Sequence, residues 1–364
     1  MLTQNNHAGN RPATLTLLWA LGAAAVPGAF PLHAQPAAAA SPAPLFLTAT
    51  NATNNSLAVI NTRTHQMDFV PTGGAGGASG NAGGIAVSGN LAAVVNFGSS
   101  NVTIFQRKGN SMQPIQMVKT TSQPLSVTFG HDHLVVLCLT NMESFPVYGN
   151  TVGNNDGIAN LLRGDGTAAQ VVSFDGGVMY SEKSGDIAQL SLSTSAASGV
   201  SGPNVSIPLP AAPNNNTPFG MVARGPYVYA TIAHSDLEAL VSNAKIVSTA
   251  NGPTPFMDPF GNITHAPCWN ALSGQFLYSA DSPGKQLVRF LVSDTNVFFD
   301  KAGVATLSGA PTDLYVQGGL LGVIDGGDGT NSNASIFTID SEGELKLTFS
   351  VKIPGAINGA AIIQ

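Results

Sequence analysis

Seven short apolar stretches recur along this 364-residue chain at nearly constant spacing, with intervals of 40, 45, 49, 49, 44 and 43 residues. Their anchor residues are Gly84, Pro124, Ala169, Pro218, Pro267, Pro311 and Pro354. A period in the forties is typical of a four-stranded propeller blade, and it is too long for a leucine-rich or ankyrin-type repeat. The spacing therefore predicts a series of four-stranded blades.

The two ends of the repeat indicate how the series closes. Only one strand, residues 355–363, follows the last anchor. The first strong strands, residues 44–50 and 56–61, precede the first anchor and resemble a blade that lacks its innermost strand. Joining both termini in one blade closes the ring and removes exposed sheet edges. We predict an all-β, seven-bladed β-propeller over residues 44–364.

Composition supports this fold and narrows the range of partners. The chain has 41 glycines and 23 prolines, is only 9% charged, and lacks an amphipathic run of helical period. Its formal net charge is −6, and its few Lys and Arg residues are scattered. Nucleic acids and anionic membranes need clustered basic residues. We therefore expect no nucleic-acid partner. We also predict that the propeller is a monomer.

The first 34 residues have the pattern of a secretory signal peptide. Arg11 precedes an apolar run over residues 13–26, and small Ala34 lies at the predicted cleavage point. A membrane anchor needs about 20 uninterrupted apolar residues, whereas Pro27 and Pro31 end this run early. The sequence predicts a secreted or periplasmic protein with a disordered tether at 35–43 and no membrane span after cleavage.

The chain contains two cysteines, Cys138 and Cys268. Their repeat positions lie three blades apart, and a disulfide needs Cα atoms within about 7 Å. We predict two buried free thiols. The alternative is a catalytic thiol at Cys268, close in sequence to His265.

The repeat unit is clearest over residues 267–291, where an anchor Pro, an apolar strand and a Gly turn precede a second strand that ends in Asp281. This unit resembles the lactonase-type propellers. That superfamily includes 6-phosphogluconolactonase-like and carboxymuconate-cyclising enzymes and non-catalytic surface-layer relatives with Tyr-Val-Thr-Asn repeats. The resemblance implies a lactone hydrolase or a cycloisomerase. The Arg-His dipeptide that often begins an inner strand in such enzymes is missing from this sequence.

Candidate site residues come from the ends of second strands and the approaches to inner strands, which reach the same face of a propeller. We expect His265 to be the best general base, supported by His234 and an acid, either Asp281 or Glu182. The predicted substrate-binding residues are Arg224, for a substrate carboxylate, with Asn96, Asn141 and Asn216. The structural alternative is that Asn and Asp at strand ends satisfy the backbone of the following turn.

No cofactor is predicted. The loop that contains Asp325 and Asp328 has oxygen ligands but lacks the closing Glu of a calcium loop, so a flexible loop is the default and calcium the alternative. The segment 131–133 has two His residues but occupies a turn that we interpret as a solvated hairpin. The Gly-rich segment 73–84 is not a phosphate loop, because neither a Lys nor a helix follows it.

Two functions from different classes remain. The first is a hydrolase or isomerase that acts on a small lactone or muconate-like acid at the axial face. The second is a non-catalytic propeller whose loops bind a protein or glycan. The family resemblance favours the first, whereas the missing Arg-His dipeptide and the sparse charge favour the second.

Overall fold

The computed structural model describes residues 41–192, 199–207, 217–233, 244–249, 252–257, 266–293 and 296–364. From residue 42 onward the chain forms one compact unit, Pro42–Gln364. The predicted signal peptide and most of the predicted tether lie outside the described residues. No described helix has the length and hydropathy needed to span a membrane.

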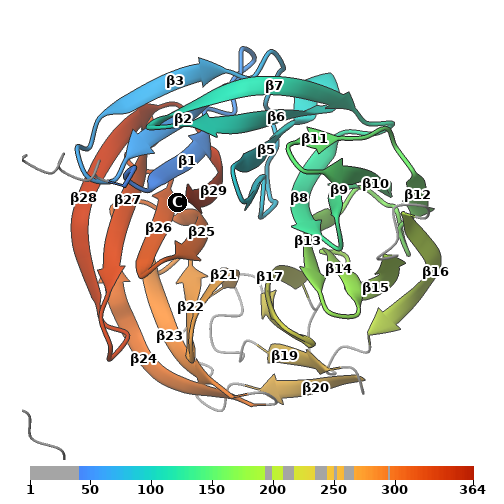
Figure 1. The fold of residues 1–364 in the computed structure, drawn as a ribbon. Coiled ribbons are helices and arrows are strands. Elements are labelled where there is room, and N and C mark those ends of the chain that lie inside the picture. Colours follow the sequence, from blue (N-terminus) through green and yellow to red (C-terminus); the bar gives the residue numbers. More distant parts are fainter. Residues whose placement is uncertain are drawn as a thin grey trace, which may run out of the picture. The chain divides into compact units, whose positions relative to one another are not determined.

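The described strands form seven sheets that surround an axis (Figure 1). The first sheet contains β1 (Leu45–Ala49), β2 (Ser56–Asn61), β3 (Met67–Pro71) and β29 (Asn358–Ile363). The second contains β4 (Ile85–Ser88), β5 (Leu91–Asn96), β6 (Asn101–Lys108) and β7 (Ser111–Lys119), with a short 3-10 helix at Phe97–Ser99. The third has five strands: β8 (Pro124–Gly130), β9 (His133–Cys138), β10 (Asn141–Tyr148), β11 (Thr151–Val152) and β12 (Gly157–Asn160).

The remaining four sheets each contain four consecutive strands. The fourth sheet is β13 (Ala168–Phe174), β14 (Gly177–Glu182), β15 (Asp186–Leu192) and β16 (Val200–Ile207). The fifth is β17 (Thr217–Arg224), β18 (Tyr227–Ala233), β19 (Ala244–Thr249) and β20 (Gly252–Met257). The sixth is β21 (Pro267–Ser273), β22 (Phe276–Asp281), β23 (Gln286–Val292) and β24 (Val297–Thr306). The seventh is β25 (Pro311–Gln317), β26 (Leu320–Asp325), β27 (Asn331–Ile339) and β28 (Leu345–Pro354).

The ring is closed by a sheet built from both ends of this unit. β29 pairs antiparallel with β1, so that Phe46 lies opposite Ile362 and Leu47 opposite Ala361. The innermost strands contact one another in a complete cycle, from β4 through β8, β13, β17, β21, β25 and β29 back to β4. The predicted all-β propeller, with one blade completed by N- and C-terminal strands, is confirmed.

The apolar runs are continuous, rather than alternating with polar residues, because both faces of most blades are covered. In β1, Leu45 and Leu47 join a cluster with Ile85 of the second sheet, whereas Phe46 joins a cluster with Ile324 of the seventh. Successive side chains of a strand point to opposite faces. A single five-residue strand thus contributes to two inter-blade cores.

Three of the five anchor prolines begin inner strands, as the repeat predicts, whereas Pro218 is the second residue of β17 and Pro354 ends the outer strand β28. β8, β21 and β25 begin at Pro124, Pro267 and Pro311, a position where the missing N–H of proline costs no ladder bond. A register shift follows each of these three prolines, for example between Pro124 and Ser126 and between Pro311 and Asp313. A bulge re-aims side chains, and these bulges place polar groups near the axis.

The Gly-rich segment 73–84, called here the plug segment, crosses the axis at the end where the inner strands begin. It binds inner strands of three different blades through Asn81 and Ala82. These bonds are Asn81 Nδ2 to Leu125 O (2.6 Å), Ala82 N to Ala169 O (3.1 Å) and Trp269 Nε1 to Asn81 O (3.0 Å). The segment therefore covers this end of the axis, called the plugged end below.

Glycine is required at Gly83, where the plug segment enters β4. Its φ is +65°, and a Cβ there would lie 3.0 Å from Ser126 Oγ. A side chain would be strained by both the backbone and the contact. The glycines of this segment allow close passage of one backbone over another.

Candidate functional site

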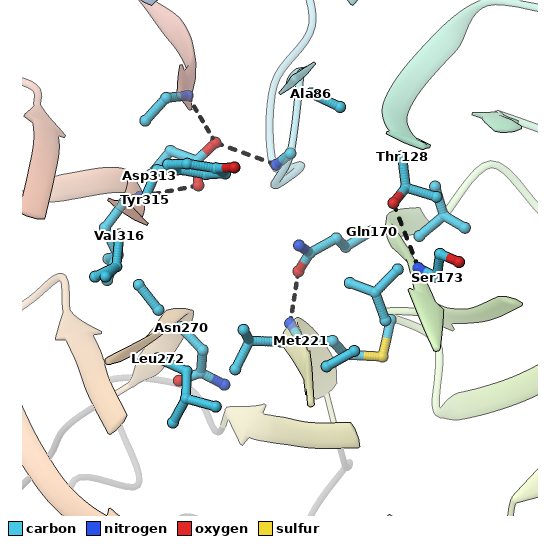
Figure 2. Close-up of a pocket in the computed structure, with 18 of the residues that line it drawn as sticks. Ala86, Thr128, Gln170, Ser173, Met221, Asn270, Leu272, Asp313, Tyr315 and Val316 are labelled. Carbon is cyan, nitrogen blue, oxygen red and sulfur yellow. Dashed lines mark hydrogen bonds between the residues drawn. The ribbon is translucent and has the colours of Figure 1, made fainter. Parts of the chain in front are cut away.

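An axial cavity of about 570 Å³ lies between the plug segment and the far ends of the inner strands (Figure 2). All seven innermost strands contribute to its wall. The lining residues include 85–87, 127–129, 170–173, 221–224, 270–272, 313–316 and Ala360. Arg224 ends β17 and Gly274 follows β21, so the cavity extends toward the end opposite the plug segment, called the open end below.

Asp313 is the acidic residue of the cavity wall. Its side chain is buried and lies on the bulge of β25, where it accepts three backbone N–H bonds. Oδ2 accepts from Gly83 at 3.1 Å and from Ala360 at 3.2 Å, and Oδ1 accepts from Leu314 at 2.9 Å. Figure 2 shows these bonds meeting at the carboxylate. One side chain thereby joins the plug segment, β25 and the C-terminal strand.

Burial raises the pKa of Asp313 to about 7, although the N–H bonds from Gly83, Leu314 and Ala360 act in the opposite direction. Desolvation disfavours the charged form of a carboxyl group, whereas hydrogen bonds to the carboxylate favour it. A raised pKa in a cavity is characteristic of functional carboxyl groups. Asp313 is therefore able to exchange a proton near neutral pH.

The other polar side chains at the bulges are committed to the backbone or to neighbouring side chains. Gln170 Oε1 accepts a bond from Met221 N at 2.5 Å (Figure 2). Asn270 Nδ2 donates to Gly220 O at 3.2 Å, and its Oδ1 accepts from Ser279 Oγ at 2.8 Å. These amides hold adjacent inner strands together.

Arg224 brings a positive charge to the open end. Its Nη1 donates to Gly274 O at 3.0 Å and its Nη2 donates to Tyr229 Oη at 2.8 Å. The guanidinium carbon lies 5.6 Å from the centre of the Tyr229 ring, within the range of a cation–π interaction. The guanidinium is thus fixed beside the cavity.

The two predicted acids, Glu182 and Asp281, lie at the plugged end and do not line the cavity. They end β14 and β22, and both are fully buried. Glu182 accepts backbone bonds from Arg163 at 3.1 Å and Gly164 at 2.8 Å, and burial raises its pKa. Asp281 accepts from Gly284 N at 3.3 Å and from Gln286 Nε2 at 2.9 Å. Asp281 matches the structural alternative, because Gly284 lies in the turn that follows its strand. Glu182 instead bonds to the loop that precedes β13.

Two predicted substrate-binding amides also lie outside the cavity. Asn96 is fully buried, and its Oδ1 accepts from Thr72 Oγ1 at 2.7 Å while its Nδ2 donates to Asn101 Oδ1 at 2.8 Å. Asn141 donates to Thr121 Oγ1 at 2.6 Å. Among the predicted site residues that are described, only Arg224 lines the axial cavity. His265, His234 and Asn216 lie outside the described residues.

Asp325 and Asp328, the alternative calcium ligands, form hydrogen bonds with residues of their own loop and of the strands beside it. Asp325 Oδ1 accepts from Gly327 N at 2.7 Å and from Asn333 Nδ2 at 2.8 Å. Asp328 accepts from Thr330 N and Asn331 N, and these bonds with the Lys352 ammonium lower its pKa. In the described part of the chain, no three His, Cys, Asp or Glu residues are grouped to hold a metal ion.

The two-histidine turn at 131–133 differs from the solvated hairpin that the sequence suggests. His133 is buried, with Nε2 2.9 Å from Asp156 Oδ2 and Nδ1 2.6 Å from His131 O. His133 begins β9, and its partner Asp156 directly precedes the extra strand β12. Both cysteines are free, as predicted, with Cys138 buried and Cys268 half-buried.

Sequence reasoning missed Asp313, although a signal was present. Among the seven anchor stretches, only the one that begins at Pro311 has a charged residue within its first four positions. An acid inside a strand buried on both faces needs a compensating environment. That mismatch could have identified Asp313.

Solved structures share this ring, whereas sequence comparisons find no relative. No family model matches the chain, and no curated protein matches it. A putative 6-phosphogluconolactonase from Bacteroides fragilis has a TM-score of 0.64 at 13% identity and covers 88% of this chain and 98% of that one. A periplasmic gluconolactonase from Pseudomonas aeruginosa has a TM-score of 0.63 at 15% identity and covers 88% of this chain and 99% of that one.

The chain has the fold of the lactonase-type propellers. The same fold also appears under other names. A hypothetical selenium-binding protein from Sulfolobus tokodaii has a TM-score of 0.56 at 11% identity and covers 89% of this chain and 93% of that one. Because one fold hosts unrelated functions, the chemistry must be argued from the axial cavity.

Proposed function

We propose that this protein hydrolyses a small lactone in the axial cavity, with the Asp313 carboxylate as general base. The observation that carries this proposal is a buried carboxyl group with a pKa of about 7 beside a cavity of about 570 Å³. A general base works best when its pKa lies near the operating pH. The names of the lactonase structures from Bacteroides fragilis and Pseudomonas aeruginosa support the same reaction class.

The hydrogen bonds of Asp313 leave it able to take a proton. A carboxylate has about four acceptor positions, and Gly83, Leu314 and Ala360 occupy three of them. The fourth, on Oδ1, accepts a proton from a water molecule whose oxygen forms a bond to the lactone carbonyl carbon. The ring C–O bond then breaks, and the ring oxygen takes the proton back from Asp313. One lactone and one water molecule thus give one hydroxy acid.

Arg224 has a complementary role at the open end. The product of lactone hydrolysis is a carboxylate, and a guanidinium is well suited to attract and orient such an anion. The bonds to Gly274 and Tyr229 hold the guanidinium in place. We propose that Arg224 orients a carboxylate of the substrate or product at the cavity opening.

The proposal also covers the location of the protein in the cell and the two candidate histidines. A leader over residues 1–34 would place the enzyme in the periplasm or outside the cell, which agrees with the periplasmic location in the name of the Pseudomonas aeruginosa structure. The roles of His265 and His234 as bases stay predictions. A His265→Ala variant tests them beside Asp313.

The experiment is a hydrolysis assay of the purified protein on glucono-δ-lactone and δ-valerolactone, with spontaneous hydrolysis subtracted, from pH 5.5 to 8. We expect kcat to rise with pH through a single ionisation near pH 7. Asp313→Asn should lower kcat by about 100-fold or more, the usual contribution of a general base. The matched control is Glu143→Gln, which changes a buried carboxylate that accepts from Thr121 N at 2.7 Å, outside the cavity.

Three results separate the alternatives. Full activity in folded Asp313→Asn refutes the role of this carboxylate, and loss of activity in His265→Ala alone assigns the base to that histidine. If Asp313→Asn does not fold, the pH profile of the unchanged protein decides, because a profile flat around pH 7 contradicts the proposal.

A non-catalytic propeller that binds a protein or glycan is the second candidate. One observation favours it, since the three backbone bonds of Asp313 give this residue a structural role without any reaction. Isomerisation of a muconate-like acid would instead use the carboxylate to take a proton from carbon. Adding such acids to the assay tests the isomerase, and no turnover on the whole panel favours the binding propeller.

A further inference from the structure

Apolar side chains line the axial cavity between the bulges and the open end, together with polar atoms of nearly equal exposed area. Five half-buried side chains from five different blades line this part of the cavity: Val87, Phe129, Val222, Leu272 and Val316. Figure 2 shows Leu272 and Val316 beside the cavity. Binding sites recognise ligands through such apolar walls with a few oriented polar groups. The wall predicts a ligand with a substantial hydrocarbon part.

Several polar side chains of the wall are already engaged, which limits how many ligand hydroxyls these side chains can serve. Asn270 uses both ends of its amide, Gln170 uses its oxygen, and Asp313 uses three acceptor positions. Thr128 Oγ1 accepts a bond from Ser173 N at 3.3 Å (Figure 2). A ligand hydroxyl that is buried without a partner is penalised. A lactone with several hydroxyl groups therefore suits this wall poorly.

The charge of the lining also argues against a phosphorylated ligand. Within the described wall, Arg224 is the single cationic side chain. It lies at the open end, and its guanidinium bonds to Gly274 O and Tyr229 Oη. Phosphate sites usually combine several cationic groups or backbone N–H donors around the anion.

A second hollow of about 290 Å³ continues from the cavity at the open end. The two hollows share Phe129, Ser173 and Ala223 in their walls. The lining of the second hollow is mainly polar and includes His131 and Asp175. A ligand whose ring lies near Asp313 could therefore extend a flexible tail only as far as Phe129, with the tail's end near solvent. The combined space suits a ring with a chain attached.

We propose that the preferred substrate is an unphosphorylated lactone with an alkyl tail, rather than a polyhydroxylated sugar lactone. This inference rests on the proposed lactone hydrolysis and adds the class of substrate. The lactone ring lies at the Asp313 level of the cavity, and the tail packs on the apolar wall toward the open end. Each buried methylene contributes about 0.8 kcal/mol, or about fourfold in affinity.

The experiment separates binding from turnover by pairing each lactone with its lactam, which is resistant to hydrolysis. Calorimetry measures the affinity of δ-lactams with no tail and with three- and five-carbon tails, and kcat/KM is measured for the corresponding lactones and for glucono-δ-lactone. We expect affinity to rise roughly threefold to fourfold per methylene. We expect kcat/KM for the five-carbon tail to exceed that for glucono-δ-lactone by at least tenfold.

A pair of leucine variants tests the position of the tail. Leu272→Gln places a polar group on the cavity wall and should lower the ratio of kcat/KM between long-tailed and tailless lactones by about tenfold. Leu347→Gln is the matched control on β28, because Leu347 is 53% exposed and does not line the cavity. The control should leave this ratio unchanged.

The outcomes distinguish the inference from the function on which it rests. Preference for glucono-δ-lactone, or lactam affinity independent of tail length, overturns the inference and leaves lactone hydrolysis standing. Tail-dependent lactam binding without hydrolysis of any lactone overturns the proposed function, while the apolar ligand class is supported. An equal loss of the ratio in Leu272→Gln and Leu347→Gln contradicts the placement of the tail.

Discussion

The two ends of the axis differ in what their polar residues do. At the plugged end, Glu182 and Asp281 are buried and bond to turns and loops, while the plug segment bonds across three inner strands. Toward the open end apolar side chains such as Val222 and Leu272 line the cavity, and Arg224 supplies the charge. The many polar residues at the plugged end stabilise the fold, whereas the few polar residues beside the cavity are the candidates for ligand binding.

Asp313 lies at the boundary between these two regions. It bonds to the plug segment through Gly83 N and to the C-terminal strand through Ala360 N, yet it also lines the cavity. Changes to the closing strand, to Asp313 and to Gly83 should therefore alter the stability of the ring, with the largest effect for the closing strand and the smallest for Gly83.

Deletion of residues 354–364 should have the largest effect, because it removes β29 and leaves β1 without its inner partner. Cooperative unfolding of the whole ring should be lost, since the deletion opens the closed cycle of inner strands. Circular dichroism during heating measures this. A truncated protein that melts like the parent would refute closure by the terminal strand.

Asp313 should make stability depend on pH. Its pKa of about 7 lies above the ordinary value of 3.8, so the folded state binds a proton that the unfolded state has released. The free energy of unfolding should therefore fall as pH rises from about 4 to 7, by up to about 4 kcal/mol at 1.36 kcal/mol per pKa unit. Above pH 7 this contribution should be constant.

The measurement compares denaturant unfolding of the parent and Asp313→Asn at pH 4.5, 6 and 7.5. At each pH, the free energy of unfolding of the variant is subtracted from that of the parent. The other carboxyl groups titrate in both proteins, so their contribution cancels in this difference. We expect a smaller loss of stability with rising pH in the variant. Identical slopes in both proteins would contradict a raised pKa for this residue.

Gly83→Ala should have the smallest effect of the three, a loss of about 1–3 kcal/mol in the free energy of unfolding. Gly83 combines a φ of +65° with a close approach to Ser126. The matched control is Gly89→Ala, because Gly89 has a φ of +54° and open space around its Cβ position. The excess loss at Gly83 measures the tight passage of the plug segment, and equal losses would argue against it.

The sequence predicts the fold well because the repeat and the strand patterns are local. Anchor prolines such as Pro124 and Pro311 begin inner strands, and the leftover strands at both termini pair as expected. The turn-capping alternative for Asp281 was also readable, since a strand-end acid and its turn are adjacent in sequence. These features depend on residues within one hairpin or one blade.

The cavity was hard to predict because its parts come from different blades. The bonds from Asn81 and Ala82 to three other blades depend on the path of a segment without a regular pattern. The environment of Asp313 likewise depends on Gly83 and Ala360, which are distant in sequence. The sequence predicts the site on the face where inner strands begin, but the plug segment covers that end and Arg224 lines the cavity at the opposite end. His265 and His234 lie outside the described residues.

The pairing of β1 with β29 also has a consequence for how the molecule matures. These strands are almost the whole length of the unit apart, so the ring cannot lock until the last residues have been synthesised. Contacts between such distant segments form slowly because a large loop must close first. A chain that lacks β29 therefore has an open ring, and the closing sheet forms only after β29 is available to pair with β1.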